Sequence, residues 1–332
     1  MLSMKPEFLS ISIQALLLAI IIDLIFGEPR AFFHVAVITG KWSSFIGKRM
    51  QSSRKPERAG WITVFLTLMP ITFLFAFVFD FLYSLPLIYI FFLIFYAIIE
   101  KSTFAFTSMG SHINPIIKSL EKGDVEETRV HVSKCVRRNV SELSEPLLIS
   151  AAIETVSEGI TDSFAGSLFY FAFFGVIGAI VYRIVNTLDS TFGYRDKANL
   201  KFGRSSATLD TILNYMPARI SSALISASAY VLNYSNRQIS LSSVLNSVPS
   251  RNAAYSMGTM ATVLNLRLEK KGSYVINRKG FEPTLRDLKK ALRIFYLSFF
   301  LMVVFVTIPL LIIMSYLFYP HIYFLFPFKI KM

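Results

Sequence analysis

Three carboxylates recur at four-residue spacing near the middle of the chain. On an α-helix, Glu154, Glu158 and Asp162 each advance about 40° from the previous one, so they fall within one narrow stripe. Like charges at this spacing repel one another, and Mg²⁺ typically binds one or two carboxylates together with phosphate oxygens. The stripe is therefore a candidate site for Mg²⁺ or a substrate amine. The alternative is a solvated acidic face.

Polar groups also stand directly beside apolar runs, where an ionisable side chain is costly and suggests a function. Two clusters of this kind are Arg183, Asn186 and Asp189, and Asp210, Asn214 and Arg219. Within each cluster the spacing predicts shared helix faces, for Arg183 with Asn186 and for Asp210 with Asn214. A snorkelling arginine with a capping aspartate, or a structural ion pair of Asp210, would explain the same residues.

A turn follows the first apolar run. It contains Asp23, Glu28, Arg30 and His34, and its Gly-Glu-Pro sequence is typical of a chain leaving a membrane helix. A histidine in this setting is more often hydrogen-bonded within the fold than a ligand. A later basic run within residues 267–279 is suited to anionic lipid or to a phosphorylated substrate, and lipid is the preferred interpretation.

The sequence lacks the common soluble signatures. It has no phosphate-binding G-x-x-x-x-G-K-[ST] loop, no G-x-G-x-x-G, no H-E-x-x-H and no G-x-S-x-G. Its one cysteine, Cys135, excludes an internal disulfide and a cysteine zinc site. Any nucleotide site must therefore be of another kind.

Composition identifies the elements that must hold these groups. The 332 residues include 34 Lys and Arg against 21 Asp and Glu, a net charge of +13. Apolar residues make up 54% and charged residues 17%, against about 45–50% and 25% in soluble domains. The chain is predicted to be an integral membrane protein with its positive charge in loops. Nucleic-acid binding is not expected, because the basic residues are not interleaved with aromatic ones.

We expect an all-α polytopic membrane protein with five to six membrane helices plus cytoplasmic amphipathic helices, forming a single domain over residues 1–332. A spanning helix needs about 20 apolar residues. The predicted segments are about 8–26, 61–79, 81–99, 164–182, 205–233 and 294–318. The first has no cleavage pattern after it and is expected to be retained. Residues 118–163 and 283–298 are predicted to be helical outside the membrane.

Lys and Arg concentrate in the loops 27–60, 100–163 and 234–293, which the positive-inside rule assigns to the cytoplasm. The loop 183–204 is also basic, yet six full spans would export it. Either the hairpin 164–233 is re-entrant, or its polar tip is buried in protein at membrane depth; the re-entrant form is preferred.

Taken in order, these stretches resemble the CobD/CbiB family, the membrane-bound adenosylcobinamide-phosphate synthases of cobalamin assembly. The similar stretches are 23–30 with His34 and Gly40, 154–162, 178–195, 202–219 and 252–268. The sequences N-T-L-D at 186–189 and P-A-R at 217–219 are the most specific.

The chain also departs from the family pattern. Gly159 stands where the family commonly has Asn, Asn139 and Val140 replace Asp-Thr after Arg138, and Ala254 replaces Gly. Ser256 replaces a usual Pro, and His34 lacks its following Pro. These departures predict an altered substrate preference or weaker activity, whereas the intact acidic residues favour an active enzyme.

The resemblance implies ATP-dependent amide formation between a propionate of adenosylcobyric acid and the amine of aminopropanol phosphate or a related amino alcohol. It implies ATP and Mg²⁺ but no tightly bound prosthetic group, and a place in the cell membrane with the active site on the cytoplasmic side. Partners would be the two substrates, the lipid bilayer and other membrane enzymes of cobalamin assembly.

The resemblance also assigns candidate roles. The candidate catalytic residues are Glu154, Glu158, Asp162, Asp189 and Asp210, with Glu158 and Asp162 as Mg²⁺ ligands. The candidate substrate- or phosphate-binding residues are Asp23, Glu28, Arg30, His34, Arg183, Asn186, Arg204, Asn214, Arg219 and Asn252. A multi-span transporter remains an alternative, although the internal repeats that transporters often carry are not evident. A catalytically altered corrinoid-binding membrane protein is another.

Overall fold

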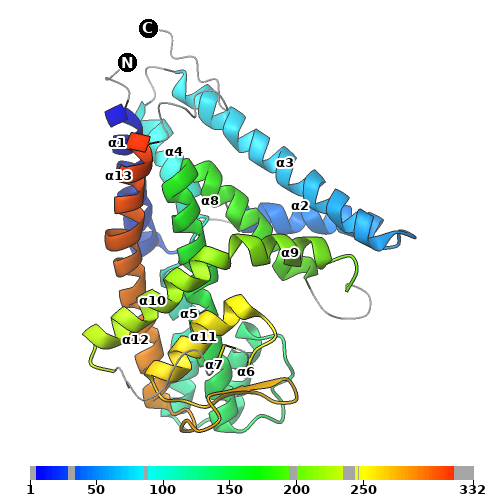
Figure 1. Cartoon of the computed structure of the whole chain (residues 1–332), viewed down its shortest axis with the longest axis vertical. Coiled ribbons are helices and arrows are strands. Elements are labelled where there is room, and N and C mark those ends of the chain that lie inside the picture. Colours follow the sequence, from blue (N-terminus) through cyan, green and yellow to red (C-terminus); the bar gives the residue numbers. More distant parts are fainter. Residues whose placement is uncertain are drawn as a thin grey trace. The chain divides into compact units, whose positions relative to one another are not determined.

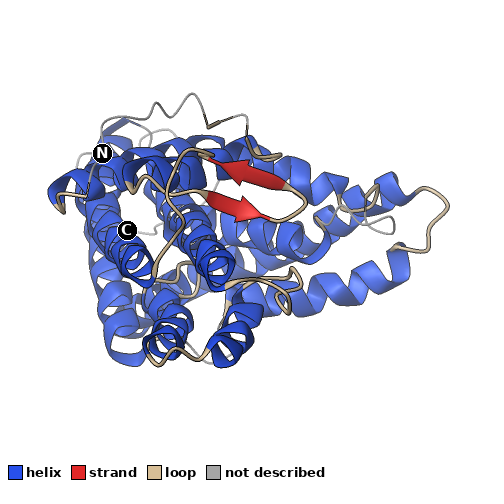
Figure 2. Ribbon diagram, turned by 90° about the horizontal axis from the view of Figure 1, so that it is seen from below, coloured by secondary structure: helices blue, strands red, loops and turns tan. Residues whose placement is uncertain are grey.

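The computed structural model describes residues 5–28, 34–85, 89–193, 200–234, 244–245 and 247–317. These residues are almost entirely helical and include one two-stranded hairpin (Figure 2), which confirms the all-α class. The chain forms two compact units, each built from segments far apart in sequence. The first comprises residues 1–105, 166–213 and 303–332, and the second comprises 106–165 and 214–302. The single-domain expectation stays a prediction.

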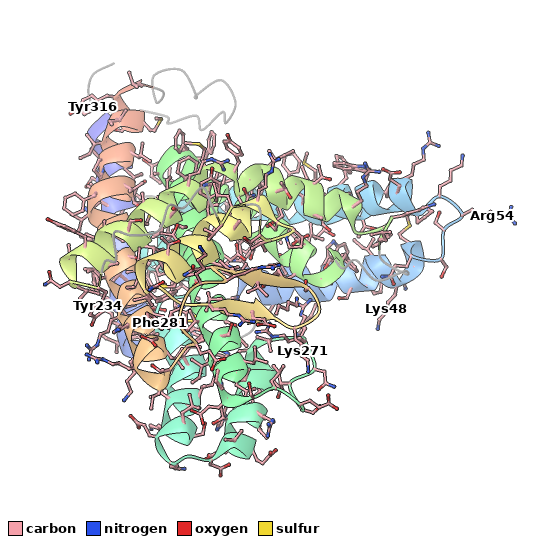
Figure 3. The ribbon with its side chains drawn as sticks, turned by 60° about the horizontal axis from the view of Figure 1, so that its bottom comes forward. Lys48, Arg54, Tyr234, Lys271, Phe281 and Tyr316 are labelled. Atoms are coloured by element: carbon pink, nitrogen blue, oxygen red, sulfur yellow. The ribbon has the colours of Figure 1, made fainter. Side chains whose placement is uncertain are left out.

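The first unit contains most of the apolar helices. They are α1 (Lys5–Phe26), α2 (Val35–Met50), α3 (Pro56–Tyr83), α4 (Tyr89–Lys101), α8 (Gly166–Phe192), α9 (Arg204–Leu213), the π-helix η4 (Val303–Thr307) and α13 (Ile308–Leu317). Helix α1 packs against α4 and α13, and α2 packs along α3 and α8 (Figure 1). The basic side chains of Lys48 and Arg54 project near the turn between α2 and α3 (Figure 3).

Helix α8 is kinked near its middle. Phe174 and Gly175 leave helical geometry, and Gly175 adopts a φ of 61°, which glycine tolerates because it has no Cβ. The kink frees the N–H of Val176, which donates to the Tyr96 hydroxyl of α4 at 3.0 Å. The backbone group therefore keeps a partner within the apolar interior, as a membrane helix requires.

The second unit surrounds one buried helix. Its elements are α5 (Thr107–Glu121), α6 (Val125–Cys135), α7 (Glu145–Gly159), the π-helix η2 (Ile160–Ala165), α10 (Tyr215–Val231), α11 (Arg251–Val263), β1 (Leu268–Lys270), β2 (Tyr274–Ile276) and α12 (Leu285–Met302). Helix α7 packs against α5, α6, α11, α12 and β1. Edge-to-face contacts of Phe164 with Phe295 and Phe299 fill the adjoining core. The helices predicted at 118–163 and 283–298 are present.

Four helical stretches of the described chain are long and apolar enough to cross a membrane: 9–26, 56–83, 145–192 and 285–317. The predicted segment 81–99 is divided, since α3 ends at Tyr83 and α4 begins at Tyr89. The predicted segment 205–233 is divided at Asn214, where α9 gives way to α10. Pro217 lies in the first turn of α10, where its missing N–H costs little.

Candidate functional site

The acidic stripe lies in the second unit. Glu154 and Glu158 stand one turn apart on α7, and Asp162 follows in η2. Glu154 is 6% exposed, Glu158 is exposed and Asp162 is half-buried. Single π-helical turns inside α-helices are frequent at functional sites. The three acids therefore have different surroundings, which their regular spacing does not reveal.

Glu154 is fully engaged by neighbouring side chains. Its Oε1 accepts hydrogen bonds from Arg138 Nη2 at 3.1 Å and from Ser150 Oγ at 2.9 Å. Its Oε2 accepts one from the Tyr274 hydroxyl at 2.7 Å. A buried ion pair is tolerable when further hydrogen bonds satisfy the remaining lone pairs, and that condition is met here.

The β hairpin supplies Tyr274 and is itself fastened to α7. The Glu269 N–H donates to Ser150 Oγ at 2.8 Å, and Arg138 Nη1 donates to the Glu269 carbonyl at 3.4 Å. Burial, the charge of Glu154 and the hydrogen bond to it together raise the pKa of Tyr274 well above its usual value. The phenol therefore stays protonated and donates.

A second polar group lies around α10. Asn214, the buried N-cap residue of that helix, donates from Nδ2 to Asp162 Oδ1 at 3.5 Å. The Arg219 guanidinium carbon lies 3.5 Å from the ring centre of Tyr215 and 4.4 Å from that of Tyr255 on α11. Such cation–π contacts hold a planar cation in one orientation. Among the ion pairs of the described residues, none involves Arg219.

Two further positions of the unit bear on the predicted site. Asn252 lies in the first turn of α11, a helix that packs against both α7 and α10. A Cβ added at Gly159 would overlap the terminal methyl of Met109. The buried Met109 side chain therefore occupies the space that an asparagine would need at this position.

The first unit holds another charged network. Lys101 is fully buried; its Nζ lies 2.7 Å from Asp23 Oδ1 and 3.1 Å from Glu28 Oε2. His34 Nε2 lies 3.1 Å from the same Glu28 oxygen. Burial alone would raise the pKa of Glu28, but the His34 hydrogen bond and the Lys101 charge outweigh it and lower the pKa to about 2. Arg30 lies outside the described residues.

The other predicted residues of the first unit are spread over α8 and α9. Arg183 donates from Nε to the Thr103 carbonyl at 2.6 Å and from Nη1 to Asn186 Oδ1 at 3.3 Å, which confirms that Arg183 and Asn186 share a face. Arg204 forms an exposed 3.3 Å pair with Glu57. Asp189 and Asp210 are half-buried.

The structure thus divides the predicted residues between the units. Glu154, Glu158, Asp162, Asn214, Arg219 and Asn252 are in the second, and Asp23, Glu28, His34, Arg183, Asn186, Asp189, Arg204 and Asp210 are in the first. The shared helix face predicted for Asp210 and Asn214 is wrong, because α9 ends at Leu213. Nothing in the sequence indicated that Lys101, Ser150 and Tyr274 contact predicted site residues. Arg138 was not assigned to the site either, although it precedes Asn139 and Val140, two of the departures from the family pattern.

Metal-binding capacity is limited. No group of three or more His, Cys, Asp or Glu residues that could hold a metal ion occurs in the described part of the chain. Glu158 and Asp162 fit Mg²⁺ only as a partial ligand set that phosphate oxygens would complete, which is the usual pattern for this ion.

Comparison with known proteins gives a consistent result. The model of the family described as "CobD/Cbib protein" matches residues 16–319. The chain is 41% identical over 307 residues to a probable cobalamin biosynthesis protein CobD of Thermoplasma volcanium, covering 91% of this chain and 99% of the relative. Proteins with the same description from Thermoplasma acidophilum and Methanocaldococcus jannaschii are 39% and 35% identical, each over 90% of this chain and 97% of the relative. No solved structure matches.

Proposed function

Because the chain belongs to the CobD/Cbib family of cobalamin biosynthesis proteins, we propose that it is a ligase that joins a corrinoid carboxylate to an amine. The carboxylate is a propionate of adenosylcobyric acid, and the amine is that of aminopropanol phosphate or a related amino alcohol. The observation that carries this proposal is the gathering in one unit of Glu158, Asp162 and Arg219, whose guanidinium is oriented by the Tyr215 and Tyr255 rings and by a 2.6 Å hydrogen bond from Nη1 to the Tyr215 carbonyl.

The chemistry explains why such residues are needed. A carboxylate is a poor acylating agent, so its oxygen first takes the terminal phosphoryl group of ATP and ADP leaves. The amine nitrogen, after losing a proton to a carboxylate base, then attacks the acyl carbon and expels phosphate. Each step moves negative charge, so oriented cations would stabilise the transition states.

Roles for individual side chains follow from their surroundings. Glu158 and Asp162 would hold Mg²⁺, which would neutralise charge on the nucleotide phosphates, or would bind the substrate amine. Arg219 is the candidate cation for a phosphate or propionate group, because its guanidinium lies against the rings of Tyr215 and Tyr255, and such a planar fork suits bidentate binding of an anion. Asp189 and Asp210 remain candidates for the base.

The same proposal includes a location. We assign the basic loops and the active site to the cytoplasmic side of the membrane, where ATP and the anionic substrates are found. Four apolar helices support a membrane protein, and the distribution of Lys and Arg supports the sidedness.

The direct test is incubation of purified protein with adenosylcobyric acid, aminopropanol phosphate and Mg-ATP, followed by mass spectrometry. We expect an amide product that depends on ATP, and its loss in Asp162→Asn. A known family enzyme run in parallel controls the substrates. Absence of product from this protein, with that control active, would overturn the proposed reaction.

A further inference from the structure

Glu154 and Glu158 differ in solvent exposure and in hydrogen-bond partners, which points to different roles for the two carboxylates. Glu154 is nearly excluded from solvent and accepts three side-chain hydrogen bonds, two on Oε1 and one on Oε2. Glu158, one turn further along α7, is exposed. A ligand at Glu154 would have to displace Arg138, Ser150 or Tyr274, and a displaced buried donor loses its hydrogen bond. Glu158 can meet a ligand without such a loss.

The donors to Glu154 come from three segments of the second unit. Tyr274 comes from β2, Ser150 from α7 itself, and Arg138 from the segment before α7. Arg138 and Ser150 also bond the backbone of Glu269 in β1. Both strands of the hairpin are therefore fastened to α7 at the same place, one by its backbone and the other by its phenol.

The fastened hairpin presents a cation to Glu158. In the antiparallel register, Lys270 of β1 is the partner of Tyr274 in β2. Lys270 and Glu158 are both exposed, and Tyr274, the register partner of Lys270, donates to Glu154, which lies one turn before Glu158 on α7. Lys271 begins the turn of the hairpin (Figure 3). Fixing Tyr274 on Glu154 thus also fixes where Lys270 lies relative to Glu158.

We propose that Glu154 is a positioning residue: through Tyr274 and Arg138 it fastens the β1–β2 hairpin to α7 and holds Lys270 beside Glu158. Lys270 is then a further binding residue for a phosphate-bearing substrate, a role that rests on the proposed function. A phosphate placed against Lys270 would complete the ligands of an ion held by Glu158. The sequence assigned Glu154 to catalysis and Lys270 to lipid.

Hydrogen exchange of the full-length protein in lipid nanodiscs tests the fastening without any substrate. Tyr274→Phe removes one hydrogen bond to a charged group, and we expect amides 268–276 to exchange about tenfold faster or more. Glu154→Gln should produce a larger increase in the same amides. Tyr230→Phe, the same chemical change at an exposed position of α10, should leave them unchanged. Equal exchange in Tyr274→Phe and Tyr230→Phe would overturn the fastening.

Steady-state kinetics test positioning against direct catalysis. Tyr274→Phe should raise KM for a phosphate-bearing substrate while kcat stays within about twofold, because the change releases the hairpin that carries Lys270. Glu154→Gln should lower kcat/KM by a smaller factor in the Tyr274→Phe background than in the wild type, because both changes act through one contact. Lys270→Gln should raise KM for a phosphate-bearing substrate. Full additivity, or an unchanged KM in Lys270→Gln, would contradict the proposal. If wild-type protein makes no amide, the ligase proposal fails while the exchange experiment still decides the fastening.

Discussion

At the scale of single residues, the contribution of a buried charge to stability depends on the side chain it is paired with. Lys101 is fully buried against Asp23. Removing one member of a buried ion pair leaves an uncompensated charge, whereas replacing both by apolar groups of similar size is often neutral. Replacing Lys101 alone should therefore destabilise the protein more than replacing Lys101 and Asp23 together. A carboxylate that only binds substrate would not show this difference.

We expect Lys101→Met to destabilise the protein by about 3–5 kcal/mol and the double variant Lys101→Met/Asp23→Leu to recover much of this loss. Thermal unfolding in detergent provides the measurement. Lys289→Met is the matched control, because Lys289 pairs with Glu121 at the surface and such pairs contribute about 1 kcal/mol or less. A double variant less stable than Lys101→Met would contradict this account of the pair.

The neighbouring Glu28 predicts a pH dependence. Its folded pKa of about 2 lies below its ordinary value of 4.5, so its stabilising contribution is fully present above the ordinary value. The contribution is lost as the pH falls from about 4.5 towards about 2. Wild-type protein should therefore exceed Glu28→Gln in unfolding temperature at pH 6, and the difference should shrink as the pH falls and vanish only below about pH 2. A difference independent of pH would show that the carboxylate charge is not the cause.

At the scale of elements, hydropathy and spacing predict helices well and their ends less well. The apolar run 8–26 is helical throughout, and the run predicted at 294–318 is helical over its described residues 294–317, with one π-helical turn at Val303–Thr307. The break at Asn214 and the division of 81–99 depend on turns inside apolar sequence, which a hydropathy average conceals.

The β1–β2 hairpin shows why the contact of Tyr274 with Glu154 could not be predicted from the sequence. Its strands are three residues long, too short for an alternating pattern to identify them. Tyr274 meets Glu154 across 120 residues of chain, and one sequence carries no signal for such a contact. The acidic stripe was visible because its spacing is local.

Packing at the end of α7 provides a third prediction. Gly159→Asn should gain less than about 1 kcal/mol of helix propensity, because Asn is itself a poor helix former. It should lose about 1 kcal/mol, near the lower end of overpacking costs, because the Met109 methyl that must move is the end of a flexible side chain. We therefore expect a small net destabilisation, and a smaller cost of the same change in a Met109→Ala background. Denaturant unfolding of the four proteins in the cycle measures the coupling. Equal costs in both backgrounds would mean that Met109 does not restrict this position.

At the scale of the whole molecule, the length of α4 and its ion pair with α1 bear on how the chain crosses the membrane. Helix α4 has 13 residues and rises only about 20 Å, whereas the hydrocarbon core is about 30 Å thick. If α4 does not complete a crossing, residues 102–144 lie opposite the loop 27–55. However, Lys101 ends α4 and pairs with Asp23 near the end of α1, so both loops leave from the same end of the helices.

This pairing predicts that residues 27–55 and 102–144 face the same compartment. Single cysteines at Arg54 and Lys134, introduced with Cys135→Ser, should both react with a membrane-impermeant thiol reagent only from the cytoplasmic side. Ser84→Cys, at the turn after α3, should react only from the other side; all three positions are exposed. Labelling of Lys134→Cys together with Ser84→Cys would instead mean that α4 turns back within the membrane. Lys134 lies shortly before α7, which carries Glu154 and Glu158. That result would therefore also place the start of α7 on the side of the membrane opposite to the cytoplasmic ATP of the proposed reaction.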